Sequence, residues 1–435
     1  MFERIQKAGY PVTTCLPSRM HPEICWCPYS HFYDGKLLNG QKRNKMEFGM
    51  RIAKHSILNE INNGGKKNVV LSPLSIHIAL NMIASGSTGQ TLKQLLHFLQ
   101  SDGISHLNAQ TSILMELAST GYTGDSGPMI RLVNGIWADL LFPLKHSFKQ
   151  LAEDVYEAKA ESADFLNKGE RVRNEINSWA REALKGNIDE LLPYGFFDKD
   201  EIKLVLANAV YFKGLWVGGG FDASNTKDED FHLLNGETVR VPFMKRSDDY
   251  YFYGSLEGFK LLKMPYKISQ LVRKRYAMYI FLPDKNDGLQ ELVEKLYVDP
   301  RFFRDNCKLK AVKLRELWLP KFKYEYALNA CESMKELGLD LPFDDEKAEI
   351  KEMVETLDLE GVNVSKVIQK SYIEVNEGGT IATVVDALRF SAGFSNDYFT
   401  TFHPSFVADH PFLFMIKEDD SGIVVSIGAT LNPLS

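Results

Sequence analysis

The stretch Leu204-Val-Leu-Ala-Asn-Ala-Val-Tyr-Phe212 is almost wholly apolar. A short, nearly continuous apolar run of this kind is typical of a strand that is buried on both faces of a sheet. Its one strongly polar residue, Asn208, must find hydrogen-bond partners inside the protein, because buried amides are nearly always paired. The stretch therefore predicts a central strand with a packed layer on each side.

Helical patterns lie mostly before this strand, and strand patterns lie mostly after it. We expect one helix from about Met46 to Asn62-Asn63-Gly64-Gly65 and an amphipathic helix over Asn174–Leu192. Later segments have the patterns of strands at 239–244, 259–265, 276–282, 311–322, 412–416 and 423–430 and of a helix at 328–337. This order predicts an α+β architecture without repeated βαβ units.

The composition is that of a soluble globular protein with a large core, since 44% of the 435 residues are hydrophobic and 25% are charged. The net charge is −6, from 51 basic and 57 acidic residues, so nucleic acid is not an expected partner. No apolar run reaches the roughly 18 residues of a membrane span, and no signal peptide is recognisable. We expect a cytoplasmic monomer, with an extracellular location by an unconventional route left open.

Residues 1–44 are irregular and rich in proline, and we interpret them as an N-terminal extension of a domain at 45–435. The five cysteines are few and odd in number, which suits a reducing compartment rather than a disulfide framework. Cys25-Trp26-Cys27 lies between His21 and His31, but a one-residue cysteine spacing without a second ligand pair is not a usual metal site. We expect no metal and no cofactor.

Catalytic motifs are missing from the sequence: it contains no Gly-x-Ser-x-Gly elbow, no phosphate-binding loop and no His-Glu-x-x-His. Asp409 and His410 are adjacent, but neighbours in an extended strand point to opposite faces, so we expect no joint catalytic role. We therefore predict that the protein is not an enzyme and has no catalytic residues.

A long segment, residues 378–405, lies between a strand pattern at 371–375 and a strong strand signal at 406–416. It has no hydrophobic period that would let it pack as an ordinary helix. Long loops of this kind inside a compact domain are uncommon and tend to carry function. The segment is either a functional loop or a tolerated insertion.

The chain resembles the serpin family, and within it the plant serpins of the Z type. The resemblance runs in family order from about Met46 to Pro433, and its main motifs are Asn68-Val-Val-Leu-Ser-Pro-Leu-Ser-Ile76, Leu206-Ala-Asn-Ala-Val-Tyr-Phe-Lys-Gly-Leu-Trp216, Ile373-Glu-Val-Asn-Glu377 and Phe406-Val-Ala-Asp-His-Pro-Phe-Leu-Phe414. It implies a serpin fold of about nine helices and three β-sheets, with an exposed reactive-centre loop at about 378–405. It also implies a target protease of the serine or cysteine type as partner.

Serpins act by strand insertion. The resemblance implies that a protease cleaves the loop, becomes acylated, and is trapped if the loop inserts into the central sheet before water hydrolyses the acyl bond. It places the proximal hinge at Glu377, Gly378, Gly379 and Thr380. It places Ser72, Ser75 and Asn208 at the shutter, the region where the central strands part. It places Trp216, Lys321 and Glu377 at the breach, the region where opening starts, and implies an ion pair between Lys321 and Glu377. Gln369 stands in the shutter where the family usually has histidine; it can donate and accept hydrogen bonds but cannot titrate.

The hinge sequence departs from the family pattern after Thr380. If Thr380 faces inward on insertion, then Ala382, Val384 and Asp386 do so too, because side chains alternate along a strand. Val384 replaces a small residue, and a buried carboxylate at Asp386 without a partner would cost several kcal/mol or take up a proton. On the outer face, Ile381 replaces a glutamate.

These changes favour slow insertion, so we predict a serpin with weak or absent inhibition. The alternative is a working suicide-substrate inhibitor of a chymotrypsin-like serine or cysteine protease. Counting fourteen positions from Thr380 in the family's manner makes Gly393 the recognition residue of the reactive bond, followed by Phe394. The bond could instead follow Phe394, because the loop is slightly longer than usual.

Overall fold

The computed structural model describes residues 47–118, 127–188, 190–198, 201–268, 274–298, 309–355, 361–380 and 403–435. Residues 1–44 form a unit separate from Lys45–Ser435. Cys25 and Cys27, where no metal site is expected, lie outside the described residues. So do hinge residues Ile381, Ala382, Val384 and Asp386 and the reactive-bond residues Gly393 and Phe394.

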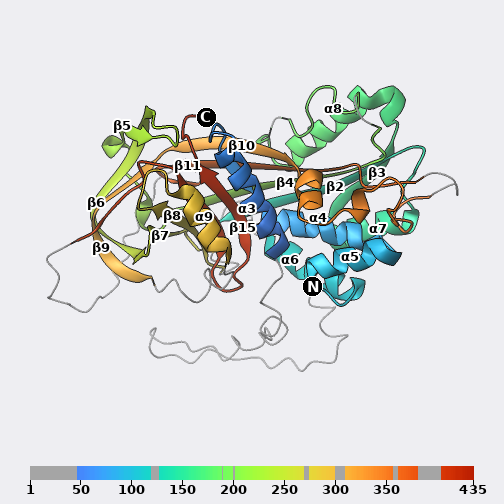
Figure 1. Cartoon of the computed structure of the whole chain (residues 1–435), viewed down its shortest axis with the longest axis horizontal. Helices are drawn as coiled ribbons and strands as arrows, with labels where there is room; N and C mark the ends of the chain where they lie inside the picture. Colours follow the sequence, from blue (N-terminus) through green and yellow to red (C-terminus); the bar gives the residue numbers. More distant parts are fainter. Residues whose placement is uncertain are drawn as a thin grey trace, which may run out of the picture. The chain divides into compact units, whose positions relative to one another are not determined.

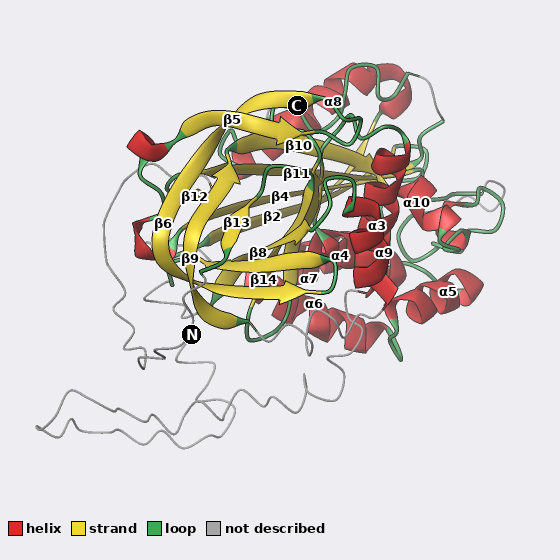
Figure 2. Ribbon diagram, turned by 60° about the vertical axis from the view of Figure 1, so that its left-hand side comes forward, coloured by secondary structure: helices red, strands yellow, loops and turns green. Residues whose placement is uncertain are grey.

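The α-helices of the described residues gather mainly in the first half of the chain (Figures 1 and 2). Their bounds are α3 Glu47–Asn62, α4 Pro73–Ser85, α5 Gly89–Leu99, α6 Ile104–Ala118, α7 His146–Tyr156, α8 Phe165–Ala183, α9 Leu289–Val298 and α10 Ala330–Glu336. Helix α4 is buried along its whole length, because its thirteen residues include no Asp, Glu, Lys or Arg. Ser72 caps it by accepting a hydrogen bond from the Ser75 amide at 3.2 Å.

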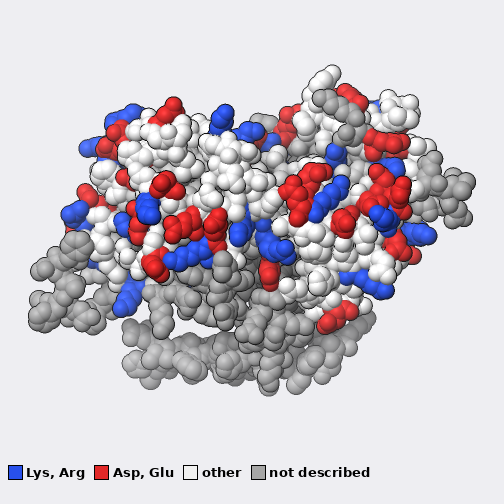
Figure 3. Space-filling view, viewed as in Figure 1, with Lys and Arg blue, Asp and Glu red and all other residues white. Residues whose placement is uncertain are grey.

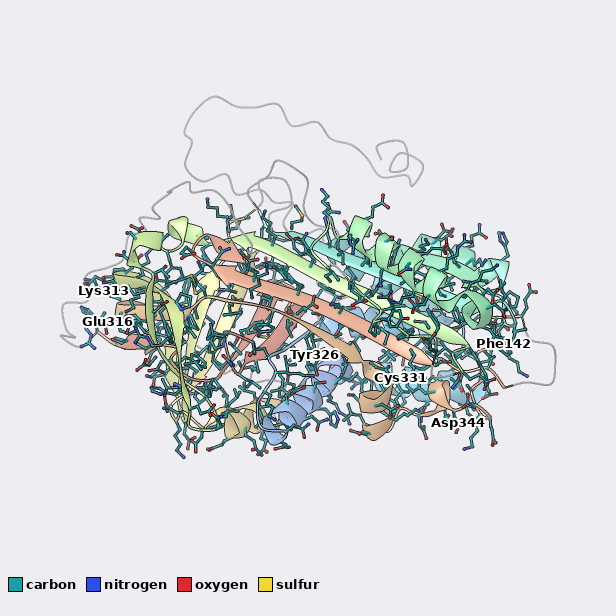
Figure 4. The ribbon with its side chains drawn as sticks, turned by 90° about the horizontal axis from the view of Figure 1, so that it is seen from above. Phe142, Lys313, Glu316, Tyr326, Cys331 and Asp344 are labelled. Carbon is teal, nitrogen blue, oxygen red and sulfur yellow. The ribbon has the colours of Figure 1, made fainter. Side chains whose placement is uncertain are left out.

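A six-stranded sheet crosses the described domain in the order β10-β11-β12-β4-β2-β3. The strands are β2 Met129–Asp139, β3 Ala158–Ala163, β4 Leu204–Leu215, β10 Phe322–Asn329, β11 Lys366–Asn376 and β12 Gly379–Thr380. Figure 4 shows its long strands running between the end marked by Lys313 and Glu316 and the end marked by Phe142. β4 is the strand that the apolar run at 204–212 predicts, and it is central in this sheet, as expected.

A second sheet of nine strands follows the order β1-β15-β14-β8-β7-β6-β9-β13, with β5 paired to β6. Its strands are β1 Val69–Leu71, β5 Lys227–His232, β6 Thr238–Leu256, β7 Phe259–Pro265, β8 Tyr276–Pro283, β9 Lys310–Pro320, β13 Ser405–Val407, β14 Phe412–Glu418 and β15 Val424–Thr430. Two of the three expected sheets are continuous here, because the nineteen-residue strand β6 pairs with β5 over residues 238–243, with β9 over 243–253 and with β7 over 252–256. The α+β fold class is confirmed.

Each face of the six-stranded sheet packs against its own core. On β4, Leu206 and Phe212 join the large core shared with α4 and the nine-stranded sheet. The alternate residues Ala207 and Tyr211 join a smaller core that is shared with α8. Side chains on one strand alternate between faces, so even-numbered β4 residues point toward the large core and odd-numbered ones toward α8.

Two predicted elements differ in their bounds. The helix expected over 174–192 is wrong in position: α8 spans Phe165–Ala183, and Lys185 and Gly186 then adopt positive φ angles of 53° and 77° that end it. The strand expected over 311–322 is two strands, β9 and β10, which belong to different sheets and meet at Lys321. Local apolar patterns did not contain the signal for either break.

Charged side chains of both signs alternate over the face shown in Figure 3, so the described residues there form no large patch of one sign. Among the described helices, none combines the length and the apolar character that crossing a membrane requires.

Candidate functional site

The hinge enters the six-stranded sheet as the two-residue strand β12. Gly379 and Thr380 lie between β11 and β4 and run antiparallel to both: Thr380 pairs with Val375 of β11 and with Gly214 of β4. Below this point β11 and β4 pair directly and in parallel, from Lys366 with Val205 to Tyr372 with Tyr211. The sheet is therefore open at one end, where β12 lies, and closed where β11 pairs directly with β4, from Lys366 to Tyr372.

Thr380 faces the large core and is fully buried. Its hydroxyl lies 2.7 Å from the hydroxyl of Tyr266, which directly follows β7. Burial raises the pKa of Tyr266, and the hydrogen bond to Thr380 lowers it by less. Tyr266 also stacks on Trp216, with ring centroids 4.6 Å apart and an angle of 13°. The inward orientation that the hinge analysis assumed for Thr380 is the one observed.

Gly379 fits where no larger residue would. A Cβ atom placed on it would lie 2.0 Å from the Gly214 carbonyl oxygen, and its φ is +156°. Distances below 3.0 Å are essentially never seen for real Cβ atoms. The close approach of β12 to β4 therefore requires glycine at this position.

Glu377 anchors the start of the hinge. Its carboxylate lies 3.0 Å from the Lys321 Nζ atom and accepts a hydrogen bond from the Thr226 hydroxyl at 2.8 Å. Burial acts to raise the pKa of Glu377, but hydrogen bonds from its own backbone, Lys321 and Thr226 outweigh burial and lower it. The structure thus contains the ion pair that was expected between Lys321 and Glu377.

The backbone around Glu377 and Gly378 is held by the connection that follows β4. The Phe221 amide donates to the Glu377 carbonyl at 2.8 Å, and the Trp216 amide donates to the Gly378 carbonyl at 3.0 Å. The Trp216 indole donates to the Asn376 carbonyl at 3.2 Å. The expected breach residues Trp216, Lys321 and Glu377 are therefore brought together at the open end of the sheet.

The expected shutter residues meet halfway along the closed part of the sheet. Asn208 of β4 and Gln369 of β11 are direct partners in the parallel register. Asn208 donates to Asn134 Oδ1 of β2 at 2.6 Å, and Gln369 donates to the Ser72 carbonyl at 2.8 Å. The prediction that Asn208 needs an internal hydrogen-bond partner is confirmed.

Several buried polar atoms of this shutter have no partner. They are Gln369 Oε1, Ser75 Oγ and Ser371 Oγ, on residues whose exposed fractions are 1%, 0% and 2%. Unpaired buried polar groups are rare in native proteins, and each calls for an explanation. A small crevice also lies beneath Thr380, lined by Val210, Phe212, Ser371, Tyr372, Ile373, Ile416 and Ser426.

The Asp409–His410 pair corrects one expectation, because the two side chains do meet. His410 Nδ1 lies 2.8 Å from Asp409 Oδ1, and its Nε2 lies 2.8 Å from the Pro283 carbonyl oxygen. The pair sits after β13 rather than within a strand, so strand alternation does not apply. Both ring nitrogens are engaged and His410 is buried, so the pair is not arranged to act on a substrate.

Tyr266 and Thr226 contact the hinge, and the sequence analysis missed both. They lie 114 and 151 residues from their hinge partners, and no local pattern marks them. Among the described residues, no group of three or more His, Cys, Asp or Glu side chains could hold a metal ion.

The comparisons with known proteins agree on one family. A family model described as Serpin (serine protease inhibitor) matches residues 43–433. Serpin-Z2A of Triticum aestivum is 38% identical over 394 residues, which cover 90% of this chain and 96% of that protein. Serpin-ZXA of Oryza sativa subsp. japonica is 40% identical over 376 residues, covering 85% and 91%.

Solved structures agree with these sequence matches. The structure of Arabidopsis AtSerpin1, described as the native stressed conformation, has a TM-score of 0.82 and 36% identity, and the match covers 92% of this chain and 99% of that one. Uncleaved ovalbumin has a TM-score of 0.73 at 21% identity, which shows a likeness in fold alone.

Proposed function

The chain belongs to the serpin family, and from this premise we propose that it is a non-inhibitory or weakly inhibitory serpin. A protease would cleave its loop, but the loop would enter the sheet too slowly to trap the acylated protease. The observation that carries the proposal is the register of β12 between β11 and β4. If the loop inserts, a continuation of that register would give each residue after Thr380 its place in the sheet.

Insertion must first separate β11 from β4. Seven residue pairs, from Lys366 with Val205 to Tyr372 with Tyr211, join these strands directly. Each lost hydrogen bond is replaced only when the incoming strand pairs on both sides. The barrier to insertion therefore depends on how easily each successive loop residue fits between the two strands.

Val384 would have to fit into a small crevice. Continued four residues beyond Thr380, the register would put it opposite Ser371 of β11 and Val210 of β4, both of which line the crevice beneath the hinge. Excess volume in a packed core costs about 1–3 kcal/mol. Because about 1.4 kcal/mol on a barrier slows a step tenfold, a cost at the low end of this range already delays insertion substantially.

Asp386 adds a charge to the same step. Continued six residues beyond Thr380, the register would put it opposite Gln369 and Asn208, where the core side of the sheet is closed to water. Burying an ionised carboxylate costs several kcal/mol unless it is fully paired. The Asn208 and Gln369 amides already donate to Asn134 and Ser72, so they would have to reorient to receive it.

The alternative function is a working suicide-substrate inhibitor of a chymotrypsin-like serine or cysteine protease. One observation favours it: the hinge is already in the sheet up to Thr380, so insertion has a starting point. The residues that follow decide between the two functions, because they set the rate of the later steps.

Incubation with a chymotrypsin-like protease tests the proposal. At neutral pH we expect cleavage near Gly393 or Phe394 without an SDS-stable protease adduct. The matched variant carries Ile381→Glu, Val384→Ala and Asp386→Thr, and we expect it to form an adduct. Adding Thr380→Arg should abolish that adduct, because Thr380 is fully buried in the sheet. A stable adduct with the unchanged protein would refute the proposal.

The proposal includes a monomer that meets its protease in the cytoplasm. The odd count of five cysteines supports a reducing compartment, and Cys331 is buried as a free thiol. Burial raises the pKa of the Cys331 thiol to about 12, so it stays protonated and unreactive.

A further inference from the structure

We propose that the shutter is an internal receptor for a protonated carboxyl group, and that the side chain of Asp386 is its occupant after loop cleavage. Strand insertion in this protein would then be promoted by acid. The inference rests on the proposed function, because it identifies which step is slow at neutral pH and what relieves it.

The register fixes where the carboxyl group arrives. Gln369 and Asn208 are now direct partners across the closed sheet. A strand that continues β12 separates them and places residue 386 between them, facing the large core, because Thr380 faces that core and side chains alternate. The segment that follows Thr380 is long enough to reach this point before the candidate reactive bond at 393–394.

The shutter offers hydrogen-bond groups that suit the neutral acid better than the carboxylate. Gln369 Oε1 is a buried acceptor without a partner, and only a donor can satisfy it. A protonated carboxyl group has one O–H donor, whereas a carboxylate has none. The Ser75 and Ser371 hydroxyls, also buried and unpaired, can donate to the remaining carboxyl oxygen.

Among the described residues, no buried Lys or Arg lies on the core side of the shutter to compensate an anion. The titratable side chains buried on that side include His77 of α4, Tyr156 of α7, Tyr324 of β10 and Cys331 of α10, and burial raises the pKa of the two tyrosines and of the cysteine. Lys370 is the nearest cation along β11, but it lies on the α8 face, where it pairs with Glu325 at 2.7 Å. Glu377 at the breach, which pairs with Lys321, and buried His77 are the other groups that the experiment must separate from Asp386.

The test measures insertion after cleavage, without reference to protease trapping. The protein is cleaved at pH 7.5, the protease is inactivated, and the pH is lowered in steps. Insertion is followed as the appearance of a species with a raised melting temperature. If only the protonated acid inserts, the insertion rate should rise about tenfold for each pH unit down to the ordinary aspartate pKa of about 3.9.

Two variants test whether Asp386 and Gln369 cause the pH dependence. Asp386→Asn is neutral at every pH and can still donate to Gln369 Oε1, so its insertion should be fast and independent of pH. Gln369→Met removes the acceptor and should slow insertion at pH 5 in the unchanged loop, but should not slow it in an Asp386→Ala loop. A pH dependence that persists in Asp386→Asn would assign the effect to another group, such as Glu377 or His77, and overturn the inference.

The outcomes distinguish this inference from the proposed function. An SDS-stable adduct at pH 7.5 refutes the proposed function, however the insertion rate of the cleaved protein depends on pH. An insertion rate of the cleaved protein that does not change with pH refutes the inference, even when no adduct forms.

Discussion

The hydrogen bond between Thr380 and Tyr266 gives the sharpest test of the hinge geometry. Both residues are fully buried, and their hydroxyls lie 2.7 Å apart. Removing one partner leaves the other hydroxyl buried and unpaired, which costs about 1–3 kcal/mol. We therefore expect Thr380→Val and Tyr266→Phe each to lower the free energy of unfolding by an amount in that range.

The double variant should be much less destabilised than the sum of the two single variants. Replacing both partners by apolar groups of similar shape leaves no unpaired hydroxyl and can be nearly neutral. The interaction term of this double-mutant cycle equals the double effect minus both single effects, so its magnitude should be about 2 kcal/mol or more. Urea unfolding of the four proteins at one pH, followed through the first transition, measures it.

A second threonine–tyrosine pair provides the matched control. Thr430 and Tyr324 are both buried, and their hydroxyls lie 3.3 Å apart in the core, away from the hinge. Thr430→Val should destabilise the protein by less, because the Tyr324 hydroxyl can still donate to the Ala429 carbonyl at 3.4 Å, and its effect should add to that of Thr380→Val, since the two sites share no partner. If the hinge variants are neutral singly, or if their effects are simply additive with each other, then Thr380 is not held by Tyr266 and the inward orientation on which the register depends is refuted.

Two further predictions concern the same strand. Gly379→Ala should reduce the free energy of unfolding by about 1–3 kcal/mol, because its Cβ atom would meet the Gly214 carbonyl oxygen. The control Gly103→Ala should not reduce it, because no atom lies near that Cβ position. Equal urea midpoints for the two variants would contradict this prediction. Glu377→Gln should lower the free energy of unfolding at pH 7, and its difference from the unchanged protein should shrink below pH 4.5. The reason is that a carboxyl group whose pKa is lowered by folding stabilises the fold at pH values above its ordinary pKa of 4.5 and loses that effect as it protonates. Urea midpoints at pH 7 and in acid measure it, and a gap that stays constant would show that the contact with Lys321 is not electrostatic.

The sequence predicts the central strand well, because its signal is local. Nine consecutive residues without alternation indicate burial on both faces, and β4 has this burial. The need of Asn208 for a partner is also a local inference, although the partner, Asn134, lies 74 residues away and could not be named from the strand itself.

The hinge contacts are less predictable, because they join segments that are distant in the chain. The sequence places Glu377 and Lys321 only through the family resemblance. Tyr266 has no motif: it follows a strand pattern and looks like any aromatic residue at the end of a strand. It becomes the partner of Thr380 only because the end of β7 lies next to β12 and to the segment after β4 in the folded protein.

The surroundings of residue 386 could not be predicted from the loop alone. Alternation along a strand says that Asp386 faces inward, and an inward position in a large core suggests apolar neighbours. The register changes this expectation, because it selects the one level of the sheet at which both neighbouring strands carry a buried amide. On the inference above, the cost of burying Asp386 would depend on its protonation rather than on an apolar environment.

On insertion, the register of the hinge would determine which face of the sheet each later loop residue occupies. Gly379 fits against Gly214 and Thr380 reaches Tyr266 only in the observed register, so the hinge decides which face each later residue takes. A slip of one residue would turn every following side chain to the other face. Asp386 would then point toward α8, where Lys370 lies, and Ile381 and Val385 would enter the core. The contacts of two hinge residues thus determine whether a carboxyl group six residues later meets an uncharged amide or a cation.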